Sequence, residues 1–115
     1  MASEEMNPEL IQAGFEAKRF LDRLKEYKAA VEEHTKAALK LEPGVLTLYV
    51  MNEKAHPEKV TVLEIYASKE AYHLHIKTAH FLKYKTSTAH MVKSLELVDV
   101  DPIEFLSKPN LLNNK

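Results

Sequence analysis

The chain has 115 residues, of which 45% are hydrophobic, and this length and composition suit one domain with its own core. Charged residues make up 29% and the formal net charge is -1, so no basic excess is present to attract nucleic acid. No apolar run approaches the roughly 20 residues that span a bilayer, and the acidic start lacks the pattern of a secretory signal. The absence of cysteine excludes disulfides and thiolate chemistry. We therefore expect a cytoplasmic protein with no membrane partner.

The first half of the chain is predicted to form a strand, a long helix and a second strand. Residues 10–19 alternate weakly between apolar and polar side chains, which favours a strand. From residue 20 to residue 41 apolar side chains recur at helical spacing, and the Pro-Gly pair at 43 and 44 ends this helix. Residues 45–52 then alternate as the second strand.

The second half of the chain is predicted to contain two more strands with helical segments between them. The strand over residues 59–67 is apolar on both sides, so we expect it in the centre of a sheet that is covered on both faces. Ser68 can cap the helix that follows. The remaining predicted elements are a hairpin connection over 53–58, a helix to about residue 77, a helical segment over 80–90 and a strand over 92–100.

This order of strand, helix, strand, strand, helix, strand predicts an α+β fold of the ferredoxin-like split βαβ type. Its antiparallel sheet carries helices on one face only, yet the third strand is apolar on both. A second subunit is the simplest cover for the other face, so we expect a homodimer. We expect residues 10–101 to form the domain, with an N-terminal extension over 1–9 and a C-terminal tail over 102–115.

Four side chains that can exchange protons or hydrogen bonds follow one another along adjoining elements. Glu64 and Tyr66 end one strand, and the helices after it carry His75 and His80. His75 comes four residues after Ala71 and is expected on the inner side of its helix. Glu64 lies on an apolar strand face and needs a partner, either a histidine or a lysine. Because His80 begins a helical segment, its ring can serve either a binding site or a local cap.

Several aromatic and apolar side chains near these groups can form the walls of an aromatic-binding pocket or simply pack in the core: Leu48, Tyr66, Phe81, Tyr84 and Met91. A metal site is not expected from the histidines. His73 and His75 are two residues apart and cannot share a helix face. His75 and His80 can approach each other, but the sequence does not reveal a third ligand.

Short motifs in a fixed order resemble the antibiotic biosynthesis monooxygenase family of dimeric α+β barrels, especially its quinol monooxygenase-like members. The resemblance extends over roughly residues 10–100 and rests on these stretches: Leu41-Glu-Pro-Gly-Val-Leu46, Glu64-Ile-Tyr66, Ser68-Lys-Glu-Ala71, His75 through Thr78-Ala-His-Phe81, Tyr84-Lys-Thr and Met91-Val-Lys-Ser-Leu95. It implies a pocket between sheet and helices, lined from the elements that carry Glu64, His75 and His80. It also implies a reaction without flavin, haem or metal.

Several chemistries share this scaffold, so the resemblance leaves more than one function open. The first hypothesis is cofactor-independent monooxygenation of a small quinol or polycyclic phenol, with His75 as the base, aided by Glu64 or His80. An isomerase or tautomerase of a small carbonyl compound, or a non-catalytic ligand-binding barrel associated with stress, are the alternatives. Haem degradation is not expected, because such relatives carry tryptophan at the position of His75 and an iron-binding histidine at that of Lys85.

Overall fold

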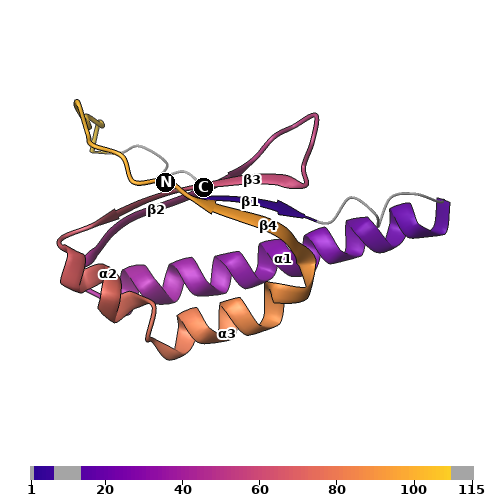
Figure 1. Ribbon diagram of the computed structural model, residues 1–115, viewed down its shortest axis with the longest axis horizontal. Coiled ribbons are helices and arrows are strands. Elements are labelled where there is room, and N and C mark those ends of the chain that lie inside the picture. The colour runs from indigo at the N-terminus through magenta and orange to yellow at the C-terminus, as the bar shows by residue number, and fades with distance from the viewer. Residues whose placement is uncertain (1, 7–13, 110–115) are drawn as a thin grey trace.

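The computed structural model describes residues 2–6 and 14–109, with side chains described from residue 22 onward. A four-stranded antiparallel sheet with strand order β2-β3-β1-β4 carries the helices on one face (Figure 1). The elements are β1 (Ala2–Met6), α1 (Gly14–Leu41), β2 (Val45–Asn52), β3 (Lys59–Tyr66), α2 (Lys69–His75), α3 (Ala79–Thr88), the short 3-10 helix η2 (Ala89–Met91) and β4 (Val92–Leu97). The predicted ferredoxin-like α+β fold is confirmed.

The first strand lies elsewhere in the sequence than predicted. β1 is Ala2–Met6, inside the expected N-terminal extension, and it pairs with β3 and β4 in the middle of the sheet. The predicted strand over residues 10–19 is wrong from Gly14 onward, where α1 begins, and residues 10–13 lie outside the described residues. The segment from residue 15 to 19 is rich in Glu, Ala, Lys and Arg, and these strong helix formers extend α1 toward the N-terminus. The sheet thus includes residues that precede residue 10.

The buried core lies between α1, α3 and the inner face of the sheet. Its members are Leu24, Tyr27, Val60, Tyr84 and Met91. The hydroxyl groups of Tyr27 and Tyr84 lie 3.0 Å apart in this core, which ties α1 to α3 through a buried hydrogen bond. The core therefore fills one end of the space between helices and sheet.

Two capped helix starts and the turn after α1 lie toward the other end of the molecule. The Ser68 hydroxyl accepts a hydrogen bond from the Ala71 amide and begins α2, as predicted. Thr78 caps α3 in the same way, by accepting from the Phe81 amide at 3.2 Å. Gly44 lets the α1–β2 turn approach α2, because a Cβ there would lie only 2.5 Å from the Ala71 Cβ. The turn after α1 is thus held directly against α2.

No helix of the described residues covers the outer face of the sheet (Figure 1), and apolar side chains lie exposed there. Tyr49 lies opposite Leu63 and Met51 lies opposite Thr61 in the β2–β3 ladder. Tyr49 and Met51 are 41% and 48% exposed. No helix among the described residues is long and apolar enough to cross a membrane.

Candidate functional site

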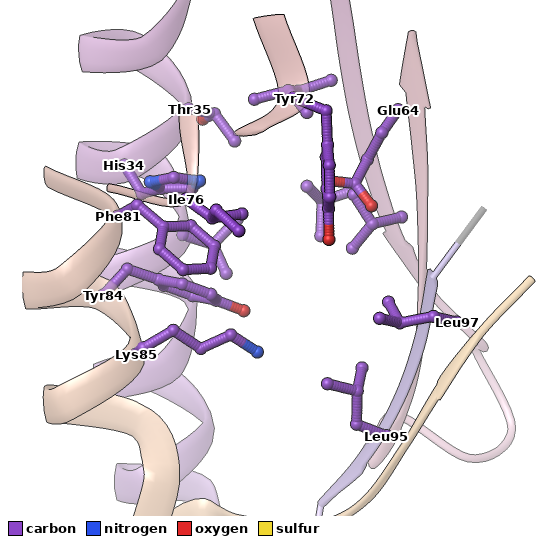
Figure 2. A pocket seen from close by; sticks show the side chains of 14 residues that line it. His34, Thr35, Glu64, Tyr72, Ile76, Phe81, Tyr84, Lys85, Leu95 and Leu97 are labelled. Carbon is purple, nitrogen blue, oxygen red and sulfur yellow. The ribbon is translucent and has the colours of Figure 1, made fainter. Parts of the chain in front are cut away.

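A cavity of about 310 Å³ lies between the helices and the inner face of the sheet (Figure 2). The helix side of its wall carries aromatic rings, and the sheet side carries aliphatic side chains and one carboxylate. Its lining residues are Val31, His34, Thr35, Leu48, Val50, Val62, Glu64, Tyr72, Ile76, Phe81, Tyr84, Lys85, Leu95 and Leu97. A mostly apolar hollow with a few polar groups is the usual form of a small-molecule site.

Glu64 provides the carboxylate on the sheet side of the cavity. Its Oε1 accepts a hydrogen bond of 2.8 Å from the Tyr66 hydroxyl, while Oε2 has no hydrogen-bond partner among the described residues. Burial, and then the charge of Glu64, raise the pKa of Tyr66 far above its ordinary value. Tyr66 therefore keeps its proton and fixes the carboxylate. The partner of Glu64 is thus a tyrosine, where the sequence analysis expected histidine or lysine.

His34 is the histidine on the helix side of the cavity, and its ring stacks on Tyr84 with centroids 4.8 Å apart. Burial lowers its pKa to about 4, and the charges of His75 and His80 act in the same direction. The ring is therefore neutral at pH 7. Its Nδ1 is buried and has no hydrogen-bond partner among the described groups. Because buried polar atoms are nearly always hydrogen-bonded, this atom is a candidate to bind a ligand or a water molecule.

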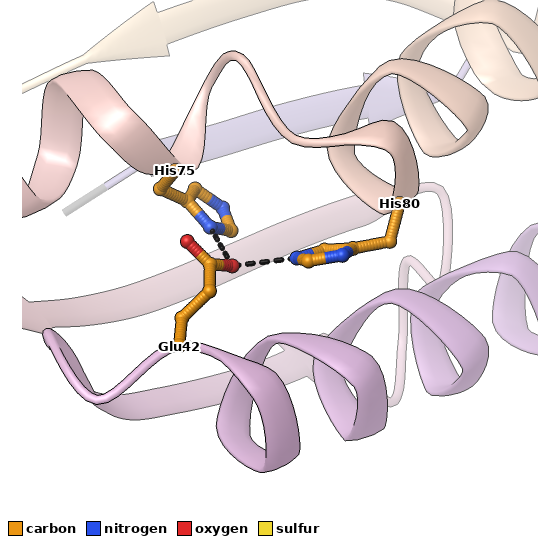
Figure 3. A group of neighbouring side chains, drawn as sticks. All are labelled: Glu42, His75 and His80. Carbon is orange, nitrogen blue, oxygen red and sulfur yellow. Dashed lines mark hydrogen bonds and ion pairs between the residues drawn. The ribbon is translucent and has the colours of Figure 1, made fainter.

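His75 and His80 converge on a carboxylate that the sequence analysis did not consider (Figure 3). His75 Nδ1 lies 2.8 Å and His80 Nε2 lies 2.5 Å from the same oxygen, Glu42 Oε2. Burial alone would raise the pKa of Glu42, but the hydrogen bonds from His80 and His75 outweigh it and hold the pKa below its ordinary value. The three side chains form a closed, hydrogen-bonded group, called here the Glu42–His75–His80 cluster.

The predicted site residues thus fall into two groups. Leu48, Glu64, Phe81 and Tyr84 line the cavity together. The other four do not line it. His75 and His80 belong to the cluster, Tyr66 contacts Glu64 from beside the cavity, and Met91 is buried in the core. His75 is only 1% exposed, with its ring centroid 5.0 Å from that of His34. His34 and the cluster are therefore neighbours.

Sequence reasoning missed Glu42 and His34. Glu42 follows the last residue of α1, where the helix dipole disfavours a carboxylate, so its position was a signal that positive or hydrogen-donating groups must lie nearby. His34 interrupts the apolar stripe of the same helix, and a histidine on a buried stripe needs a polar neighbour. Neither signal identifies which residues lie beside Glu42 or His34, because those neighbours come from segments far away in the sequence.

The sequence matches the family model for antibiotic biosynthesis monooxygenase over residues 16–87. That match covers more than half of the chain. A search of curated proteins found no match to the chain. The residues that carry both the cavity and the cluster mostly fall within the matched range.

Solved structures of similar proteins have the same fold. A candidate antibiotic biosynthesis monooxygenase from Bacteroides thetaiotaomicron is 42% identical, covers 93% of this chain and 90% of its own, and superposes with a TM-score of 0.76. Another, from Nitrosomonas europaea, has 17% identity and a TM-score of 0.70, with 90% and 95% of the two chains covered. A third, from Caulobacter crescentus, has 19% identity and a TM-score of 0.67, with 88% and 86% covered. The two distant structures support the fold alone.

Proposed function

Because the chain belongs to the antibiotic biosynthesis monooxygenase family, we propose that it oxidises a small quinol or polycyclic phenol with O2 and without a cofactor. The cavity beside Glu64 is the observation that carries this proposal. Its volume of about 310 Å³ suits a one- or two-ring compound, and the rings of Phe81 and Tyr84 offer flat walls for it.

Glu64 is the proposed proton acceptor. The Tyr66 hydroxyl occupies Oε1 and orients the carboxylate, which leaves Oε2 to accept a hydrogen bond from the phenolic hydroxyl of a ligand in the cavity. A directly contacting carboxylate can take up that proton as the phenol loses an electron. The aliphatic and aromatic side chains that make up most of the wall reduce the contact of the reacting ring with water.

The proposed reaction balances without an added reductant. The phenol loses its hydroxyl proton to Glu64 and one electron to O2, and the resulting phenoxyl radical and superoxide combine to form a carbon–oxygen bond. The oxygen–oxygen bond of this peroxide then breaks as the ring carbon loses its hydrogen as a proton and Glu64 gives up the proton it took. Both protons go to the departing oxygen. One oxygen atom stays on the ring as a quinone carbonyl and the other leaves as water, so the substrate supplies all four electrons.

His75 and His80, which the sequence analysis expected to act as bases, are proposed as positioning residues. Both form hydrogen bonds with Glu42, and neither lines the cavity. His80 directly precedes Phe81, whose ring lies in the cavity wall. Holding Glu42 fixes the start of α3 against the end of α1. The wall that carries Phe81 is thereby kept in place.

A homodimer formed through the outer face of the sheet is part of the proposal. The half-exposed side chains of Tyr49 and Met51 form an apolar surface that a second copy would cover. Light scattering should then give a molar mass twice that of one chain. The Leu63→Glu variant, which places a charge on the same face, should have the molar mass of a single chain. A wild-type mass of one chain would contradict the dimer.

The reaction is tested by following O2 consumption with 1-naphthol as the probe, with 18O-labelled O2 in a parallel sample. We expect one labelled oxygen in the naphthoquinone formed and no turnover without O2. Turnover of a carbonyl probe without O2 would favour the isomerase alternative. Binding of 1-naphthol without any oxidation would favour a non-catalytic barrel. Either result would contradict the proposed monooxygenase.

A further inference from the structure

The Glu42–His75–His80 cluster brings together three side chains of the kinds that bind transition metals. Each offers one ligand atom, and these atoms all lie within 4.8 Å of one another. The side chains are shielded from solvent, with exposed fractions of 12% for Glu42, 1% for His75 and 16% for His80. We infer that this cluster is a binding site for a divalent transition-metal ion of the Zn²⁺ class.

The ligands come from three separate helix ends, and each end is fixed by its own contacts. Glu42 follows α1 and its amide donates to the Ala38 carbonyl, His75 ends α2, and His80 lies in the first turn of α3. The Thr78 hydroxyl donates to the His75 carbonyl and caps α3, so it links the two histidine segments. Ligands on rigid elements are preorganised, which is what a tight metal site needs.

The two distances from histidine nitrogen to the Glu42 oxygen fit a metal after a small movement. Ligand atoms around a tetrahedral zinc ion lie about 3.3 Å apart, as follows from bonds of about 2.0–2.1 Å. The two nitrogen–oxygen separations are now 2.8 Å for His75 and 2.5 Å for His80. An ion that takes the place of the two bridging protons would widen each by less than 1 Å. The two imidazole nitrogens lie within 4.8 Å of each other and would have to close toward about 3.3 Å.

The chemistry of the ligand set selects the class of ion. Two imidazoles with one carboxylate suit zinc and its neighbours, whereas Ca²⁺ and Mg²⁺ prefer oxygen ligands alone. The ion would also offset the negative dipole end of α1, beside which Glu42 lies.

His34 provides an independent observation beside the cluster. Its ring centroid lies 5.0 Å from that of His75 and 5.8 Å from that of His80, and its buried Nδ1 has no partner among the described groups. Three ligands leave the fourth position of a tetrahedral ion for water. A water molecule bound there would have the buried, unpartnered Nδ1 of His34 as a nearby hydrogen-bond acceptor.

This inference is independent of the proposed oxidation. None of the three ligands lines the cavity, so the ion ties α1, α2 and α3 together and takes no part in the reaction with O2. The metal can be absent while the cavity still oxidises phenols, and the metal can bind in a protein that oxidises nothing.

The test is calorimetric titration of the untagged, chelator-treated chain with Zn²⁺, followed by Co²⁺ as a spectroscopic probe of tetrahedral coordination. We expect one ion per chain, a rise in melting temperature and binding at least tenfold weaker in Glu42→Gln and His80→Ala. The matched control is His56→Ala. It removes an exposed histidine that also lies near a carboxylate, with His56 Nδ1 3.5 Å from Glu58 Oε1, and it should bind as tightly as wild type.

NMR of the wild-type imidazole signals gives a readout that needs no variant. On addition of Zn²⁺ the signals of His75 and His80 should shift together at one equivalent, before that of His56. No saturable binding, equal binding by the Glu42→Gln and wild-type chains, or a first shift at His56 would each overturn the site. A hydrogen-bonded cluster with no affinity for metal would then be the correct description.

Discussion

The cavity and the Glu42–His75–His80 cluster lie side by side but differ in almost every physical respect. The cavity is hollow and mostly apolar, with Glu64 on the sheet side and one carboxylate oxygen without a partner among the described residues. The cluster is closed, and every member binds another member. Reactive residue types therefore gather in one place, while the space for a ligand lies in the other. The types of residue alone therefore do not locate a binding site. A polar atom without a partner that faces an open cavity is the better indicator.

The largest expected effect comes from removing the charge that faces the cavity. Glu64→Gln keeps the size of the side chain and an oxygen for the Tyr66 hydroxyl, but it cannot take up the phenolic proton. We expect kcat for 1-naphthol oxidation to fall by about 100-fold or more, as is usual for loss of a general base. Tyr66→Phe keeps the carboxylate and should cost much less. Equal losses in the two variants would show that orientation, and not proton uptake, is the role of Glu64.

The second prediction challenges the role given to the cluster. His75→Ala removes a ring that is 1% exposed and one hydrogen bond to Glu42, so we expect a loss of about 3 kcal/mol in the free energy of unfolding. Urea denaturation measures this loss. His73→Ala is the control on the same helix, where the side chain is exposed and little change is expected. A folded His75→Ala protein with kcat as low as Glu64→Gln would make the cluster part of the reaction.

The third prediction concerns acid, through the histidine between the two regions. The pKa of His34 is about 4 in the folded chain and near 6.5 when unfolded, so the unfolded chain binds the extra proton between these values. Stability from this group is full above pH 6.5 and is lost as the pH falls toward 4, which amounts to about 2 kcal/mol between pH 7 and pH 5. Urea denaturation at both pH values measures it. In His34→Gln the pH dependence should be weaker by that amount, and an unchanged dependence would contradict the assignment.

The smallest expected effect tests how firmly the aromatic wall of the cavity is held. Tyr27→Phe removes the hydroxyl that lies 3.0 Å from that of Tyr84 in the core. We expect a loss of about 1 kcal/mol in the free energy of unfolding, the usual net value of such a hydrogen bond. A stability equal to that of the wild type would mean that this buried hydrogen bond contributes nothing.

The sequence predicted those elements whose signals are local. The strand over residues 45–52 was predicted with the bounds it has in the structure, and Ser68 was identified as a cap from its position before the helix. The first strand was misplaced because weak alternation over residues 10–19 competed with strong helix propensity, and propensity prevailed from Gly14 onward. Pairing in the middle of a sheet depends on distant strands, which no local pattern reveals.

The candidate site was predicted in its residue types but not in its pairing. Glu64, Phe81 and Tyr84 line one cavity, and His75 meets His80. The sequence could not show that Glu42 joins the two histidines, because that contact depends on how the turn after α1 packs against α2. Gly44 allows this packing, but in the sequence it indicated only the end of the preceding helix.

The most direct test of the division between the two regions is a crystal structure of the protein with bound 1-naphthol. We predict that the ring occupies the cavity between Phe81 and the sheet, with its hydroxyl within hydrogen-bond distance of Glu64 Oε2. The hydrogen bonds from His75 and His80 to Glu42 should remain as they are. A naphthol hydroxyl bound to His75 or His80, or a ring bound outside the cavity, would contradict the account.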